Sequence, residues 1–140
     1  SASLIKELQN FHNIPTSRVI VDEDGVGGGV MDILSCNGFV NNSRALYGEN
    51  YVNLKSQCSF GMAKLITDKL CAEICTDEDV KNSVIEEMAE VKQANIDSDG
   101  KVAIIAKDVM KEHLGRSPDE WDSVMMRFWF ELNNSDFYFK

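Results

Sequence analysis

Apolar positions along the chain alternate between helix-like and strand-like spacing, and this alternation predicts an α/β fold. The first segment, from about Ala2 to Asn13, has apolar residues at helical spacing and ends before Pro15. A β-branched run at 18–21 follows and is typical of a strand buried on both faces. It leads through a glycine-rich turn into a helix at 30–34, after which a shorter strand begins at Phe39.

The second half of the chain is predicted to be mainly helical. Capping residues and periodicity predict these elements in order: a helix over 53–71 capped by Asn53, a helix over 77–93 capped by Thr76, a β-hairpin over 94–105 turning at Asp99-Gly100, and helices over 107–113 and 117–132. Internal repeats and proline-rich linkers are absent from the sequence. We therefore predict one domain, 1–140, with a short central sheet flanked by helices and a hairpin insertion.

The charge is unevenly distributed. Residues 1–70 hold 6 basic and 7 acidic residues, whereas residues 71–140 hold 8 and 16, which together give the formal net charge of −9. Phosphate contacts need Lys and Arg. The charge therefore excludes a uniformly basic nucleic-acid surface, but it does not exclude nucleic-acid binding as such.

Targeting signals are not evident in the sequence. No apolar run approaches the roughly 20 residues needed to cross a bilayer, and nothing resembles a signal peptide. The four cysteines lack metal-finger spacing, which favours reduced core thiols over zinc or disulfides. We expect a soluble protein of the cytoplasm.

Asp22 is the first candidate for chemistry. It stands at the carboxyl end of the predicted strand, where open α/β sheets place their sites, and the glycines after it would let a ligand or another chain approach. A dinucleotide site is disfavoured because Val30 breaks GxGxxG at its third glycine, and a phosphate loop because no Gly-Lys-Ser/Thr follows. A tight turn with acidic caps and no function remains an alternative.

Asp119 and Asp122 form the second candidate. On a helix opened by Ser117, these two carboxylates share a face and could hold a hard cation through oxygen ligands. The alternative is an ordinary helix start, where acidic residues are favoured by the helix dipole. The residues alone leave both interpretations open.

Six segments, spread over nearly the whole chain, agree in order and spacing with the pattern of one protein family. The first is the strand-turn-helix segment Val19–Asp32. The others are Gly38-Phe39, Tyr51–Gln57, Asp99–Lys101, Ala106–Asp108 and Gly115–Asp122. Each segment is weak alone, but together they resemble the carboxy-terminal nuclease domain of the large subunit of bacteriophage terminases, which has a ribonuclease H-like fold.

This resemblance implies a nuclease that cuts concatemeric double-stranded DNA during genome packaging in the cytoplasm of a bacterial host. It further implies two Mg²⁺ or Mn²⁺ ions held by Asp22 and Asp122, with Asp119 as a helper; Asp24 and Asp32 are further acids nearby. The implied partners are DNA, the terminase small subunit and the portal, and the gene would belong to a phage or prophage.

The family pattern also contains a preceding strand with another essential Asp, and an ATPase motor, neither of which matches this sequence. We therefore expect a weak or inactive fragment. Its strand at Val19–Val21 would expose an edge, and we expect either a dimer or swapped assembly through that edge, or the chain's own hairpin covering it.

Two alternatives remain open: a non-catalytic module that binds DNA or packaging partners, and another ribonuclease H-like nuclease related to resolvases or transposases. Candidate DNA contacts are Arg116, Lys107 and Lys55, although scattered basic residues are usually solvated surface.

Overall fold

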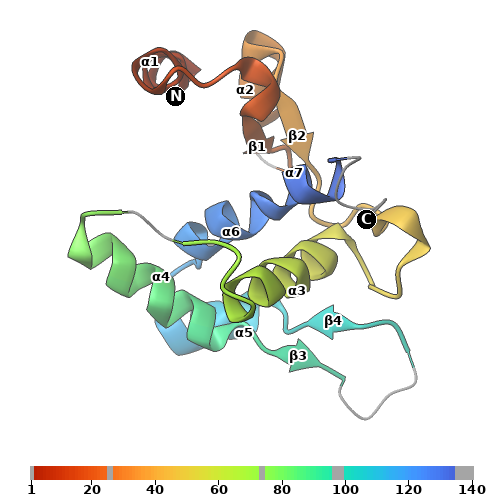
Figure 1. The fold of residues 1–140 in the computed structure, drawn as a ribbon. Coiled ribbons are helices and arrows are strands. Elements are labelled where there is room, and N and C mark those ends of the chain that lie inside the picture. Colours follow the sequence, from red (N-terminus) through yellow and green to blue (C-terminus); the bar gives the residue numbers. More distant parts are fainter. Residues whose placement is uncertain (1, 25–26, 73–74, 96–99, 135–140) are drawn as a thin grey trace. The chain divides into compact units, whose positions relative to one another are not determined.

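The computed structural model describes residues 2–24, 27–72, 75–95 and 100–134, and the chain divides into two compact units, Ser1–Ser43 (unit 1) and Arg44–Lys140 (unit 2). In chain order the elements are α1 (Ala2–His12), the 3-10 turn η1 (Thr16–Arg18), β1 (Ile20–Asp22), α2 (Gly27–Leu34), β2 (Asn37–Phe39), the 3-10 turn η2 (Leu46–Gly48), α3 (Leu54–Thr67), α4 (Glu78–Glu90), β3 (Gln93–Ala94), β4 (Ala103–Ile104), α5 (Lys107–Leu114), α6 (Asp119–Met126) and α7 (Phe128–Leu132) (Figure 1). The mixed helix and strand content confirms the α/β prediction. The single domain 1–140 stays a prediction.

Unit 1 is built around a parallel pair of strands. β1 and β2 pair with Val21 opposite Gly38 and Asp22 opposite Phe39, and α2 connects them. Phe39 is fully buried, whereas Ile20 and Val21 are only half-buried. The prediction that this strand is buried on both faces is therefore wrong for the described residues. In those residues the sheet has two strands, so the second edge of β1 carries no strand.

Gly38 is the point of closest approach inside unit 1. A Cβ atom at this position would collide with the Glu23 carboxylate and the Met31 sulfur. A larger residue at this position would therefore require the ends of the Glu23 and Met31 side chains to move away from β2. Of the glycine-rich turn predicted after Asp22, residues 25–26 lie outside the described residues, and α2 already begins at Gly27.

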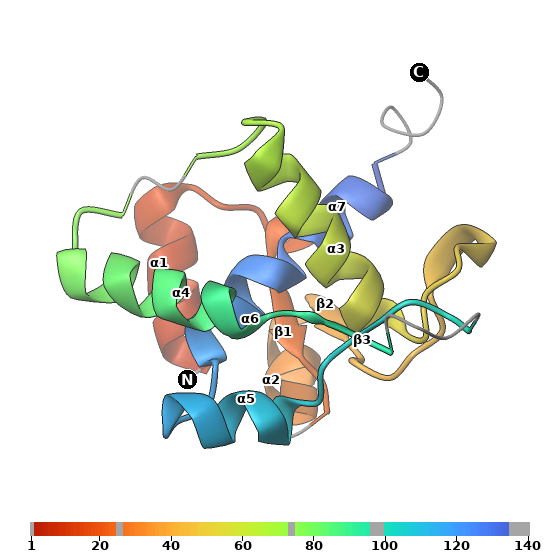
Figure 2. The ribbon, with the colours of Figure 1, turned by 90° about the horizontal axis from the view of Figure 1, so that it is seen from below.

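Unit 2 is organised around α3. Asn53 caps this helix by accepting a hydrogen bond from the Ser56 amide at 2.9 Å, as predicted. α3 packs against α6 and α7, and α4 packs against α5 and α6, an arrangement that both views show (Figures 1 and 2). The buried apolar side chains of unit 2 are Ala45, Leu54, Cys58, Met62, Leu65, Met110, Trp121, Met125, Phe128 and Leu132.

The predicted β-hairpin is confirmed in its pairing. β3 and β4 are antiparallel, with Gln93 opposite Ile104 and Ala94 opposite Ala103. Residues 96–99 of its predicted turn lie outside the described residues. A single parallel bridge joins Val102 to Tyr51, which ties the hairpin to the segment before α3.

Besides the earlier start of α2, three further predictions of helix boundaries are wrong. α3 ends at Thr67 rather than Cys71. α4 is capped by Asp77, whose carboxylate accepts from the Asp79 and Val80 amides, and not by Thr76. The last helix is split into α6 and α7 at Arg127.

In the part of the chain that the structure describes, no helix has the length and apolar character needed to cross a membrane. Of the four cysteines, Cys58 is buried, whereas Cys36, Cys71 and Cys75 are half-buried, so the prediction of core thiols holds for Cys58 alone.

Candidate functional site

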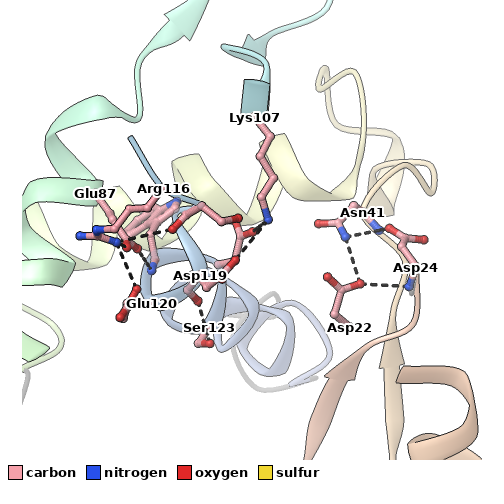
Figure 3. Close-up of polar contacts among 12 residues, drawn as sticks. Asp22, Asp24, Asn41, Glu87, Lys107, Arg116, Asp119, Glu120 and Ser123 are labelled. Atoms are coloured by element: carbon pink, nitrogen blue, oxygen red, sulfur yellow. Dashed lines mark hydrogen bonds and ion pairs between the residues drawn. The ribbon is translucent and has the colours of Figure 1, made fainter. Parts of the chain in front are cut away.

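The first carboxylate cluster lies where both strands of unit 1 end. Asp22 is the last residue of β1, and Asn41 follows β2, so their parallel pairing brings the two side chains to one edge. The Asn41 side-chain amide donates to Asp22 Oδ1 at 3.2 Å and to Asp24 Oδ2 at 2.7 Å (Figure 3). The Asn41 backbone N–H donates to the same Asp24 oxygen at 2.7 Å, and the Asp24 N–H donates to Asp22 Oδ1 at 3.0 Å.

These hydrogen bonds leave one oxygen of each residue unused. Among the described residues, none donates to Asp22 Oδ2, Asp24 Oδ1 or Asn41 Oδ1. Carboxylate and amide oxygens are the ligands that Mg²⁺ and Mn²⁺ prefer. The donor set at this edge therefore suits a hard divalent ion. Sequence reasoning did not identify Asn41, although the parallel strands placed it near Asp22.

The second cluster surrounds Asp122 in the first turns of α6. Asp122 is 9% exposed, and each of its carboxylate oxygens accepts from a lysine. Lys55 of α3 lies 2.7 Å from Oδ1, and Lys107, the first residue of α5, lies 2.6 Å from Oδ2. Three helices therefore converge on one carboxylate, and that carboxylate is neutralised by two ammonium groups.

Asp119 stands at the outer side of this cluster. Its side chain is 75% exposed and its Oδ1 lies 3.6 Å from the Lys107 ammonium. Figure 3 draws the Lys107 side chain extended toward Asp119. Asp119 and Asp122 thus share one face of α6, and Lys107 lies against both. Burial lowers the pKa of Lys107, but the hydrogen bond and charge of Asp122, with a smaller effect of Asp119, outweigh it and raise the pKa above its usual value.

Arg116 is held by a buried acid. The Glu87 side chain is fully buried and accepts from both the Arg116 guanidinium and the Trp121 backbone N–H, the latter at 2.7 Å. Arg116 also donates to Ser83 Oγ at 2.7 Å and lies 3.4 Å from Glu120. This network joins α4 to the start of α6, so the guanidinium has a structural role.

An apolar pocket of about 380 Å³ lies between α3, α4 and α6. Its lining does not include the carboxylates described above, and its two basic residues, Lys81 and Arg127, each pair with a glutamate. The pocket therefore offers a hydrophobic surface rather than a reaction centre.

The predicted site residues thus fall into two clusters, each within its own unit. Asp22 belongs to unit 1 and is joined there by Asp24, whereas Asp119 and Asp122 belong to unit 2 and are joined by Lys55 and Lys107. Within the described ranges, no group of three or more His, Cys, Asp or Glu side chains gathers as a ready metal site. In the Asp22 cluster, carboxylate oxygens remain that accept no hydrogen bond from the described residues, whereas both oxygens of Asp122 are occupied by lysines.

Comparison with solved structures defines the class of fold: it is that of the nuclease domain of a phage large terminase subunit, as the sequence resemblance predicted. The chain is similar to the nuclease domain of the large terminase subunit gp2 of bacterial virus Sf6, with a TM-score of 0.66 and 18% identity over 90% of this chain and 70% of that one. A point mutant of the same domain with manganese gives a TM-score of 0.67, at the same identity and coverage. No family model and no curated protein sequence matches the chain.

Proposed function

We propose that this chain is part of a metal-dependent endonuclease that cuts concatemeric double-stranded DNA during phage genome packaging. The observation that carries the proposal is the likeness of fold to a terminase nuclease domain over 90% of the chain. The manganese named with one of those structures supports a divalent cofactor.

The proposed ligands are Asp22, assisted by Asp24, in unit 1, and Asp122, assisted by Asp119, in unit 2. Each of these carboxylate sets would hold a Mg²⁺ or Mn²⁺ ion, and in two-metal nucleases such ions activate a water and stabilise the leaving oxygen of the cleaved phosphodiester. Asp22 needs no rearrangement for this role, because its Oδ2 accepts no hydrogen bond from the described residues.

Asp122 has to exchange a partner before it can bind an ion. Lys55 is 12% exposed and is enclosed beside Asp122, whereas Lys107 is 35% exposed and reaches solvent. Lys107 is therefore the lysine that would move away from Asp122 when an ion binds. Its ammonium group would then be free to pair with a DNA phosphate, in line with its predicted role as a DNA contact.

The other two predicted DNA contacts receive less support. Lys55 is enclosed beside Asp122, and Arg116 is engaged by Glu87 and Ser83. Both side chains would have to break an existing interaction to reach a phosphate. Among the three candidates, Lys107 is the one that we retain as a DNA-binding residue.

The wider assignments remain proposals that rest on the same likeness of fold. We propose that this chain belongs to a larger terminase protein whose partners are the terminase small subunit and the portal. We further propose that its gene is that of a phage or prophage and that the protein acts in the host cytoplasm. The unpaired edge of β1 in the described sheet supports the further proposal that isolated chains pair through it.

One observation favours a second candidate function. Both oxygens of Asp122 are occupied by lysines, and this arrangement is also what a non-catalytic module that binds DNA or packaging proteins would retain for stability. No specific observation favours a resolvase or transposase relative.

Cleavage of plasmid DNA by the full-length protein in Mn²⁺ distinguishes these functions. We expect Asp22→Asn and Asp122→Asn to slow cleavage by more than about 100-fold. Replacement of a residue that only orients a metal ligand typically costs about 10–100-fold, so a larger loss indicates a ligand. Asp79→Asn, which alters an exposed acid of α4, serves as the control and should cut like the parent. Equal rates for the parent and both site variants, or no cleavage by the parent, would contradict the nuclease assignment.

A further inference from the structure

We infer that Asn41 is a positioning residue: it holds Asp22 and Asp24 together as one rigid pair of carboxylates for a divalent ion. The inference rests on the proposed function and extends it to a neutral residue that acts through the two acids. Its basis is the set of hydrogen bonds from Asn41 to both acids.

The geometry uses both hydrogens of one amide. The Asn41 Nδ2 group donates to Asp22 Oδ1 at 3.2 Å and to Asp24 Oδ2 at 2.7 Å, so a single nitrogen bridges two like charges. Two carboxylates a few ångströms apart repel each other by about 1 kcal/mol in water and more where solvent is excluded. A bridging donor offsets that repulsion and sets the rotamer of each acid.

The backbone fixes the bridge itself. The Glu23 N–H donates to Phe39 O at 2.9 Å, so the pairing of the two strands continues one residue past Asp22. The Ser43 N–H and hydroxyl both donate to Val40 O, at 3.1 and 2.8 Å, which closes a turn around Asn41. The Asn41 N–H bond to Asp24 adds a third anchor. The side chain is therefore oriented before any ion arrives.

Such preorganisation has a measurable consequence. Residues that orient a metal ligand typically change metal affinity by about 10–100-fold when they are replaced. Loss of the Asn41 amide would let Asp22 and Asp24 separate and turn toward solvent. We expect the affinity for Mn²⁺ to fall in that range while the fold of unit 1 is retained.

Asn37 provides a matched control in the same pair of strands. Its side-chain amide donates to Ser17 O at 3.1 Å and to Val19 O at 2.9 Å, so it ties β2 to the start of β1 without touching a carboxylate. Replacement of Asn37 by leucine removes two hydrogen bonds from a similar side chain. It therefore reports what a purely structural loss does to unit 1.

The experiment compares the parent, Asn41→Leu, Asn41→Ser and Asn37→Leu in the full-length protein. Leucine keeps the size of asparagine without its donors, and serine keeps one donor. Mn²⁺ affinity is measured by calorimetry, urea unfolding is measured without metal, and plasmid cleavage is measured with Mn²⁺. We expect Asn41→Leu to bind Mn²⁺ about 10–100-fold more weakly, Asn41→Ser to fall between, and Asn37→Leu to bind like the parent.

Other results of this experiment would overturn the positioning role of Asn41 or separate it from the nuclease assignment. Parent-like Mn²⁺ binding by Asn41→Leu, or an equal loss of affinity and stability in Asn37→Leu, would overturn the positioning role. Absence of Mn²⁺ binding by the parent would overturn it as well. If the affinities follow the expected order but the parent cuts no DNA, Asn41 keeps its role and the nuclease assignment fails.

Discussion

Lys107 and Asp122 form an ion pair in which the ammonium nitrogen lies 2.6 Å from the carboxylate Oδ2. This oxygen is one that the proposed nuclease would offer to a divalent ion. The pair therefore stabilises the described structure, and in the proposed nuclease it would compete with a metal ion for this oxygen. Replacement of Lys107 allows the effect on stability and the effect on metal affinity to be measured separately.

Lys107→Met should bind Mn²⁺ more tightly than the parent. An ammonium group near a bound cation repels it by about 1 kcal/mol when water screens the pair, which corresponds to about fivefold in affinity. Lys111→Met is the control, because Lys111 lies on the same helix and is exposed. Calorimetric titration with Mn²⁺ checks the prediction, and equal affinities for the parent and Lys107→Met would refute the proposed competition.

The same ion pair predicts a dependence of stability on alkaline pH. Burial lowers the pKa of Lys107, but the hydrogen bond and charge of Asp122 outweigh it, so the folded-state pKa lies above the usual 10.5. A raised pKa contributes stability that is fully present below pH 10.5 and is lost as the pH rises through the folded-state value. The free energy of unfolding of the parent should exceed that of Lys107→Met by at most about 1 kcal/mol, since the lysine is partly exposed. Urea unfolding across this range should show the difference shrinking only above pH 10.5; a difference that grows with pH would contradict the assignment.

Replacement of Asp122 should destabilise unit 2 as well as abolish cleavage. Lys55 is 12% exposed, so Asp122→Asn leaves a nearly buried ammonium without its counter-ion. Breaking a buried pair in this way costs about 3–5 kcal/mol. The double variant Asp122→Asn with Lys55→Met should recover most of the unfolding free energy but none of the cleavage. Recovery of cleavage in the double variant would show that Asp122 acts only through stability.

Local signals in the sequence account for the elements that were predicted correctly. The cap of α3 was predicted at Asn53 because its hydrogen bond is made within three residues. The β3–β4 hairpin was predicted from a short turn between two strands, and the strand that ends at Asp22 from its β-branched run. Each of these features depends on neighbours in the chain.

Features that depend on distant residues could not be predicted in the same way. Lys55 and Lys107 are 67 and 15 residues from Asp122 in the sequence, and nothing local pairs them with it. The prediction that β1 is buried on both faces failed. Apolar side chains indicate that a strand prefers burial, but they do not indicate which elements pack on each of its faces. Asn41 was missed because a polar residue after a strand is typical of any loop.

Arg116→Met should be the most destabilising change of an arginine in unit 2. It leaves the fully buried Glu87 carboxylate with only the Trp121 N–H and no charged partner at hydrogen-bond distance among the described residues, a loss of about 3–5 kcal/mol. Arg127→Met is the matched control, because its pair with Glu131 is on the surface and contributes at most about 1 kcal/mol. Urea unfolding of both variants checks the difference. Similar losses in the two variants would show that Glu87 is not a buried, charged partner of Arg116.

Two glycines in helices should respond in opposite ways to alanine. A Cβ on Gly61 of α3 would collide with the Phe128 ring, and overpacking of this kind costs about 1–3 kcal/mol, more than alanine returns through its helix propensity of about 1 kcal/mol. A Cβ on Gly29 of α2 meets nothing within 4 Å, so Gly29→Ala should gain about 0.5–1 kcal/mol. Urea unfolding of both variants checks the pair, with stabilisation expected only for Gly29→Ala. If Gly61→Ala stabilised the protein as well, α3 and Phe128 would not be packed as closely as described.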